Sequence, residues 1–221
     1  MFRHAVVAAA LLVAVGARPA HAQAKVEAGV NFGWTFSDGV SGNSLTVPGV
    51  GIFDRVDPKD SGSLGFHVGV LVTESAEVGF LYSHQFSTLK LGGTTDYEVG
   101  TLGINSYHGY FQYNFAPHDR PLVPFIYGGL GATNFSSVDA TVNGVSRSIG
   151  GGTQFSTTWG GGVKFFPNPK IGVRVAGSWT PTYIKSDAAG WWCDPYWGCY
   201  LVGNAQYANQ FTIGAGVLFR F

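Results

Sequence analysis

The strongest constraint on the fold is an alternation of apolar residues with small or polar residues that recurs in eight segments of the chain. Successive side chains of a strand point to opposite faces, so a period of two predicts strands with one apolar and one polar face. The first segment has large or apolar side chains at every second position: Val26, Ala28, Val30, Phe32, Trp34 and Phe36. The eight segments are residues 25–36, 62–73, 76–86, 104–115, 122–135, 155–166, 171–183 and 210–221.

The composition places these strands in a membrane. Only 12% of the residues are charged, 15% are aromatic and 33 are glycine. After the first residues, no run reaches the roughly 18 apolar residues of a spanning helix. In lipid, the other structure that satisfies every backbone N–H and C=O group is a closed barrel. We therefore expect an all-β fold, an eight-stranded antiparallel up-and-down transmembrane β-barrel. The formal net charge of zero argues against a nucleic-acid partner.

The connections between the segments alternate in length. Long polar or glycine-rich loops are expected at residues 37–61, 87–97, 136–154 and 184–209. Tight turns are expected at residues 74–75, 116–121 and 167–170. Outer-membrane barrels have long external loops and short periplasmic turns, and this alternation predicts the same arrangement.

The N-terminus has the pattern of a secretory signal peptide. Arg3 and His4 precede an apolar stretch over residues 5–16, and Ala20-His21-Ala22 supplies a small-x-small cleavage site. A second site, Ala22-Gln23-Ala24, lies two residues further on. We expect a signal peptide over residues 1–22 and a barrel over residues 23–221.

Three stretches resemble a known family. They are Tyr113-Asn-Phe-Ala-Pro with Tyr127-Gly-Gly-Leu-Gly-Ala132, the run Gly160-Gly-Gly-Val-Lys-Phe-Phe-Pro-Asn-Pro-Lys-Ile-Gly-Val-Arg174, and the terminal run Ile213-Gly-Ala-Gly-Val-Leu-Phe-Arg-Phe221. They are similar to sequences of the OmpA/OmpX-like outer-membrane β-barrel superfamily. The resemblance implies a place in the bacterial outer membrane. It also implies a C-terminal sorting signal, read by the barrel-assembly machinery, at Val217, Phe219 and Phe221.

Five charged residues fall on the polar faces near the periplasmic ends of the strands: Glu27, Glu77, Lys164, Arg174 and Arg220. An eight-stranded barrel is narrow enough for side chains to fill it, and buried charges there must be paired. We expect a filled lumen with a salt-bridge network in its periplasmic half, below His67 and Gln112. A structural plug is the favoured reading, and a gated ion path is the alternative.

Aromatic residues near the strand ends predict the two interfacial girdles of the barrel. On the periplasmic side they are Phe111, Tyr113, Phe115, Phe165, Phe219 and Phe221. On the outer side they are Trp34, Phe36, Tyr82, Phe155 and Trp179. The segment at residues 122–135 is apolar on both faces and contains Pro124, so its two faces are left unassigned.

The last long loop contains both cysteines, Cys193 and Cys199. In an oxidising compartment, a close pair predicts a disulfide bond. A zinc site is disfavoured because the loop contains no histidine. The loop is also rich in aromatic residues, which serve either surface contact or burial in the outer interface: Trp191, Trp192, Tyr196, Trp197 and Tyr200.

The favoured function is that of a monomeric, non-enzymatic barrel with a structural or surface-interaction role, among outer-membrane lipid and lipopolysaccharide. Narrow passage or binding of small hydrophobic molecules is the alternative. A lipid A-modifying enzyme would need His84 with Ser83 or Ser87 near Glu98, and strand parity places both serines opposite to His84. No cofactor or metal is expected. The rival fold, a soluble lipocalin barrel, would point its apolar face inward.

Overall fold

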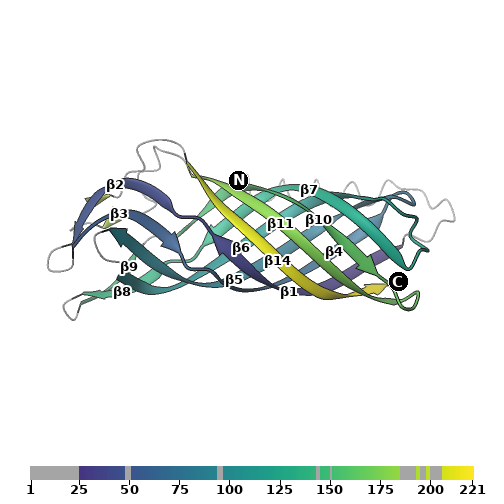
Figure 1. Cartoon of the computed structure of the whole chain (residues 1–221). Helices are drawn as coiled ribbons and strands as arrows, with labels where there is room; N and C mark the ends of the chain where they lie inside the picture. The colour runs from purple at the N-terminus through teal and green to yellow at the C-terminus, as the bar shows by residue number, and fades with distance from the viewer. Residues whose placement is uncertain are drawn as a thin grey trace, which may run out of the picture.

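The computed structural model describes residues 25–47, 51–93, 97–142, 145–149, 151–184, 193–194, 198–199 and 206–221. Eight strands form the wall of a barrel (Figure 1). They are β1 (Val26–Ser37), β4 (Ser61–Leu71), β5 (Ala76–Gly93), β6 (Tyr97–Asn114), β7 (Leu122–Phe135), β10 (Gly152–Phe165), β11 (Ile171–Ile184) and β14 (Gln206–Arg220). Within the described residues, no helix is able to cross a membrane.

The wall is a single antiparallel sheet that closes on itself. Each strand pairs with the next in sequence around the barrel, and β14 pairs with β1 from Glu27 opposite Arg220 to Ser37 opposite Gln210. A closed ladder leaves no row of unpaired backbone groups facing lipid. The eight-stranded antiparallel barrel expected from the sequence is therefore confirmed.

Large apolar side chains lie on the outside of the wall and small or polar ones on the inside. All the expected girdle residues except Tyr82 are exposed on the outer surface, among them Phe111, Phe165 and Phe219. Tyr82 is half-buried. Tyr82 lies between the rings of Phe66 and Tyr107, each at a centroid distance of 5.1 Å. The outward orientation of the large apolar side chains is opposite to that in a lipocalin, where they point into the barrel.

The structure assigns the two apolar faces of β7. Val123, Phe125 and Tyr127 are buried inside the barrel, while Leu122 and Ile126 are exposed on the outside. The strand is apolar on both sides because its inner residues pack against one another in the lumen. Pro124 faces outward and keeps its acceptor role, since its carbonyl oxygen takes a 2.9 Å hydrogen bond from the Phe115 N–H.

The expected long loops at the outer end are wrong in part, because much of that chain continues as β-structure. Residues 37–61 contain β2 (Val40–Val47) and β3 (Gly51–Pro58), and residues 136–154 contain the hairpin of β8 (Val138–Val142) and β9 (Val145–Ile149). Residues 184–209 contain β12 (Cys193–Asp194), β13 (Gly198–Cys199) and the start of β14. The loop expected at residues 87–97 is also shorter than predicted, since β5 runs to Gly93 and β6 begins at Tyr97.

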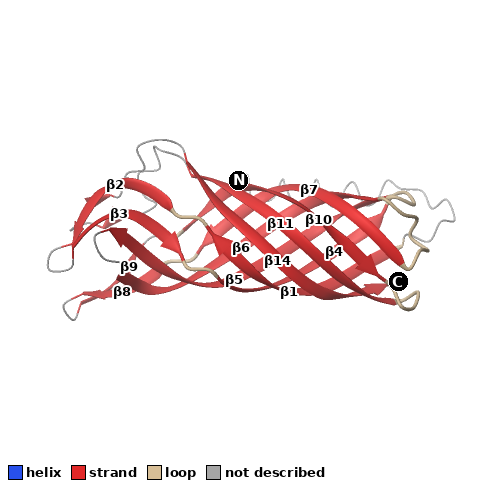
Figure 2. Ribbon diagram, viewed as in Figure 1, coloured by secondary structure: helices blue, strands red, loops and turns tan. Residues whose placement is uncertain are grey.

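These strands form an extension beyond the outer end of the barrel, seen at the left of Figure 2. β3 continues β4 after a break at Lys59 and Asp60, and it pairs with the far end of β5. Water can satisfy exposed backbone groups there, so the strands need no apolar face toward lipid and their sequences lose the alternation used to predict strands. The tight turns lie at the opposite end, as expected.

Glycines on the inner face make room for the large side chains of the lumen. A methyl group added at Gly160 would lie 2.6 Å from the Tyr127 ring and 2.6 Å from the Gly177 carbonyl oxygen. At Gly177, on the outer face of β11, an added methyl group would meet nothing nearer than 3.9 Å.

We therefore predict that Gly160→Ala lowers the free energy of unfolding by about 1–3 kcal/mol, as expected for overpacking. Gly177→Ala is the matched control and should leave it nearly unchanged. Urea unfolding of the detergent-solubilised barrel, followed by tryptophan fluorescence, measures both. Equal stability of the two variants would contradict the packing seen around Tyr127.

Candidate functional site: the lumen of the barrel

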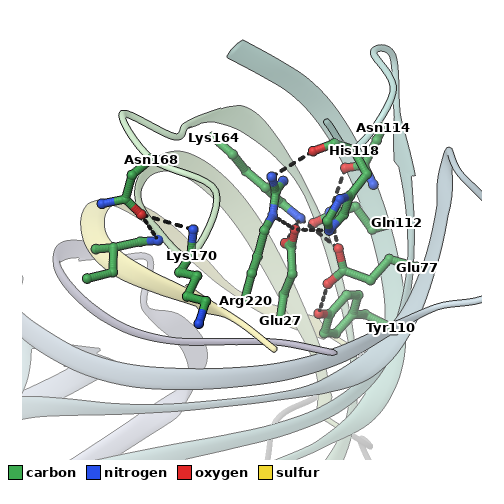
Figure 3. Close-up of polar contacts among 11 residues, drawn as sticks. Glu27, Glu77, Tyr110, Gln112, Asn114, His118, Lys164, Asn168, Lys170 and Arg220 are labelled. Atoms are coloured by element: carbon green, nitrogen blue, oxygen red, sulfur yellow. Dashed lines mark hydrogen bonds and ion pairs between the residues drawn. The ribbon is translucent and has the colours of Figure 1, made fainter. Parts of the chain in front are cut away.

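A charged cluster closes the periplasmic end of the lumen (Figure 3). The Lys164 ammonium group lies between two carboxylates, donating to Glu27 Oε2 and, at 2.6 Å, to Glu77 Oε2. All three side chains are at most 1% exposed. Strand geometry places them together, since each occupies an inward position on a different strand: β10, β1 and β5. A buried ammonium with two carboxylate partners is well compensated.

Neutral groups satisfy the remaining acceptor positions of Glu77. The Tyr110 hydroxyl donates to Glu77 Oε1 at 2.5 Å, and the Gln112 side-chain amide donates to Glu77 Oε2 at 2.8 Å. Gln112 was expected above the charges but lies among them, where it also donates to Asn114 Oδ1 at 2.9 Å.

Arg220 connects this cluster to the periplasmic turn between β6 and β7. Its Nε donates to Glu27 Oε1 at 2.7 Å, and one terminal nitrogen donates to the His118 carbonyl oxygen at 2.6 Å. Its guanidinium carbon also lies 3.2 Å from the centre of the Phe166 ring. The last residues of β14 thus hold a turn from the middle of the chain against the end of the barrel.

His118 stays neutral in this turn. Burial first, and then the positive charge of Arg220, lower the pKa of His118 below its ordinary value, although the charge of Glu27 opposes the shift. The 3.6 Å separation between His118 Nε2 and Glu27 Oε1 is therefore not an ion pair at neutral pH.

Arg174 does not take part in the ion pairs of the other four charges. It faces the lumen beside Lys164, its register partner on the neighbouring strand, and among the described residues no carboxylate lies within ion-pair distance of it. Its guanidinium carbon lies 4.5 Å from the centre of the Phe125 ring and 5.4 Å from that of Tyr127. The structure thus joins four of the five expected network residues and places the fifth on an aromatic platform.

A polar cavity lies above that platform, so the expectation of a fully filled lumen is wrong. It offers about 90 Å³ to the centres of water molecules. Its wall carries residues of all eight barrel strands, and many of them are small: Gly33, Gly65, Ala176, Ser178, Thr212 and Gly214. Short side chains at facing positions leave space that the large platform residues do not reach.

Two layers close the lumen above the cavity. Gln210 donates to Gln85 Oε1 at 2.6 Å, and Gln85 donates to Ser37 Oγ at 2.9 Å. Beyond them the extension encloses an apolar cluster: Val40, Val56, Leu89, Leu102, Ile104, Phe135, Val138, Ile184 and Ala208. The cluster was not predicted, because inward positions of a barrel were expected to be polar. The available signal was the set of apolar residues in the segments expected to be loops.

The remaining predicted sites fall at the surface or outside the described residues. Cys193 and Cys199 are backbone register partners of β12 and β13, but their side chains are not described, so the disulfide stays a prediction. The aromatic loop residues Trp191, Trp192, Tyr196, Trp197 and Tyr200 lie outside the described residues, as does the predicted signal peptide. Val217, Phe219 and Phe221 lie on the outer face at the end of β14, and their sorting role stays a prediction.

The residues of the candidate enzyme site do not lie together. His84 Nδ1 lies 2.8 Å from Asn105 Oδ1 on the outer face, whereas Ser83 lines the inner cavity. Glu98 lies in the extension, 3.1 Å from the Lys59 ammonium. Among the described residues, no group of histidine, cysteine, aspartate and glutamate side chains is arranged to hold a metal ion.

We predict that Lys164→Met lowers the free energy of unfolding by about 3–5 kcal/mol, because it leaves two buried carboxylates without their shared cation. Lys170→Met, in the exposed turn after β10, is the matched control and should have little effect. Urea titration of the folded barrel, scored by the fraction migrating as the heat-modifiable form, measures the difference. A loss below about 1 kcal/mol would show that the cluster is not compensated as described.

Comparisons with known proteins agree with this architecture. The structure is similar to that of OprG from Pseudomonas aeruginosa, with a TM-score of 0.62 and 14% identity over 90% of this chain and 96% of that one. It is also similar to the outer-membrane protein AlkL in lipid bilayers, with a TM-score of 0.55 and 16% identity over 93% and 94% of the two chains. Neisserial surface protein A gives a TM-score of 0.52 and 14% identity over 89% and 96%.

At these identities the solved structures establish the fold alone. No curated protein sequence matches the chain. The sequence profile of the outer membrane protein beta-barrel domain, however, matches residues 5–221. This match covers nearly the whole chain and agrees with the closed barrel, its outward apolar face and its periplasmic turns. The chain therefore belongs to the outer-membrane protein β-barrel family and lies in the bacterial outer membrane.

Proposed function

We propose that this protein is a monomeric, non-enzymatic outer-membrane barrel that acts through contact at the cell surface and not as an open pore. The observation that carries the proposal is the folded extension at its outer end. The extension has its own apolar core, in which Leu89, Leu102 and Val138 are at most 2% exposed. A barrel that only seals or stiffens the membrane needs no such structure, whereas a rigid projecting surface favours recognition.

The charges on the extension support its position outside the hydrocarbon. Arg55 donates to Asp57 at 2.8 Å, and Lys59 donates to Glu98 at 3.1 Å. Arg55, Lys59 and Glu98 are about half exposed, and charged groups at the lipid face of a barrel are costly. The extension therefore stands in the lipopolysaccharide headgroup layer or above it, where a partner can reach it.

The closed lumen argues against free passage of solutes. The Lys164 cluster closes the periplasmic end, and the Gln85–Gln210 layer and the apolar cluster close the outer end. An ion or sugar on this route would have to separate the buried ion pairs of Lys164 with Glu27 and Glu77. Eight strands leave too little width for a detour around them.

We predict that proteoliposomes with the wild-type protein do not swell in arabinose, and that the protein shows no steady conductance in planar bilayers.

A variant with residues 40–58 replaced by a short turn should keep the heat-modifiable barrel, since β2 and β3 lie outside the closed wall. Cells with only this variant should lose aggregation or surface adhesion shown by wild-type cells, whereas Arg120→Gln cells, altered in the periplasmic turn, should keep it. Large steady channels, or unchanged cell-surface behaviour, would contradict the proposal.

A groove on the outer face favours binding of small apolar molecules as the second candidate function. It lies across β10, β11 and β14 near the outer girdle, with a volume of about 620 Å³, and is lined mainly by aromatic residues: Phe155, Trp159, Trp179, Tyr183 and Tyr207. Pro181 also lines it. The β10–β11 ladder has no registered pair between Ser156–Thr182 and Trp159–Trp179, and Pro181, which has no N–H, lies in that gap.

We predict that a brominated alkane quenches tryptophan fluorescence of the protein in nanodiscs in a saturable way. The saturable part should disappear in the double variant Trp159→Phe/Trp179→Phe. It should persist in Trp34→Phe, which removes a girdle tryptophan on β1, away from the groove. Quenching that only rises in proportion to the alkane dissolved in the bilayer, alike in all three proteins, would exclude a bound apolar ligand.

A further inference from the structure

The lumen contains one more positive charge than its carboxylates compensate. Among the described inward residues of the barrel, Glu27 and Glu77 are shared between Lys164 and Arg220 through the contacts described above. Arg174 is the third cation and has no carboxylate within ion-pair distance. Its side chain is 2% exposed, and its Nε is buried without a hydrogen-bond partner. An uncompensated buried charge costs several kcal/mol, so the molecule needs a counter-charge or ordered solvent at this point.

Aromatic rings hold the guanidinium group in place. Its carbon lies 4.5 Å from the Phe125 ring centre and 5.4 Å from that of Tyr127, within cation–π distance of both rings. Cation–π contacts of this kind are attractive, and they leave the hydrogen-bonding edge of a guanidinium available. Arg174 also forms part of the wall of the polar cavity. The arginine is therefore positioned before any ligand arrives.

The cavity wall around Arg174 suits a small anion. Hydroxyl and amide side chains of Asn31, Ser106, Thr158, Ser178 and Thr212 line it, and no aspartate or glutamate does. His108 is 1% exposed, also lines the cavity, and its Nδ1 has no partner. At roughly 30 Å³ for each water in the liquid, 90 Å³ corresponds to about three water molecules. Only a small molecule fits there.

We propose that the lumen cavity is a binding site for a small carboxylate, held by Arg174 and by the surrounding hydroxyl groups. A guanidinium matches a carboxylate through two parallel hydrogen bonds, which are stronger than those to neutral acceptors. A short hydroxy-acid fits best, because its hydroxyl group finds partners in the serines and threonines of the wall. The site is independent of the contact surface proposed for the extension, and it requires no open pore.

The test uses the mature barrel, folded in phosphocholine micelles and labelled with ¹⁵N, with sodium lactate as the probe. Lactate is added during folding in one arm and after folding in the other, and sodium chloride at equal ionic strength is the reference. We expect saturable lactate-specific shifts of the Thr158 and Ser178 amides in at least one arm. Because a charge-assisted pair is lost, Arg174→Gln should weaken binding by more than about tenfold. Arg120→Gln should bind as the wild type does.

A second variant separates loss of the site from loss of the fold. Ser178→Leu keeps Arg174 but fills the cavity, so it should also lose the saturable shifts while keeping a dispersed spectrum and heat-modifiable migration. Shifts that are absent in the wild type, or that chloride reproduces, would overturn the proposal and leave water as the occupant of the cavity. Lactate binding that survives both Arg174→Gln and Ser178→Leu would overturn it as well.

Discussion

The closed backbone ladder is the constraint on which the rest of this structure depends. In lipid, each unpaired N–H or C=O group costs several kcal/mol, and the pairing of β14 with β1 removes the last free edge. Closure with eight strands fixes a narrow interior. It also forces alternate residues of every strand to face either lipid or lumen, so a single register decides both the membrane surface and the contents of the barrel.

The narrow interior is organised in layers along its axis. Lys164 and its carboxylates occupy the periplasmic end, Phe125 and Tyr127 form a platform with Arg174, and a polar cavity follows. Glutamines and then apolar side chains close the outer end. Among the described lumen charges, only that of Arg174 has no opposite charge within ion-pair distance. That imbalance, next to an open space, is why a ligand belongs there.

The two ends of the barrel serve different purposes. The periplasmic end is tied together by side chains from distant parts of the sequence, such as Arg220 on the carbonyl of His118. The outer end continues as paired strands with an apolar core and a charged surface. This asymmetry is the reason for placing the function at the cell surface, with the periplasmic cluster as the stabilising end.

The sequence by itself determined the barrel, the faces of every wall strand except β7 and the inward position of the five charges, because a period of two fixes which side chains share a face. It failed on the loops, since strands in water need no apolar face. Only the tertiary structure decided which charges meet: Arg174 and Lys164 are register partners on one face, yet both carboxylates contact Lys164 and neither contacts Arg174. The cavity, the apolar core of the extension and the missing carboxylate partner of Arg174 depend on contacts between distant strands, which local pattern does not encode.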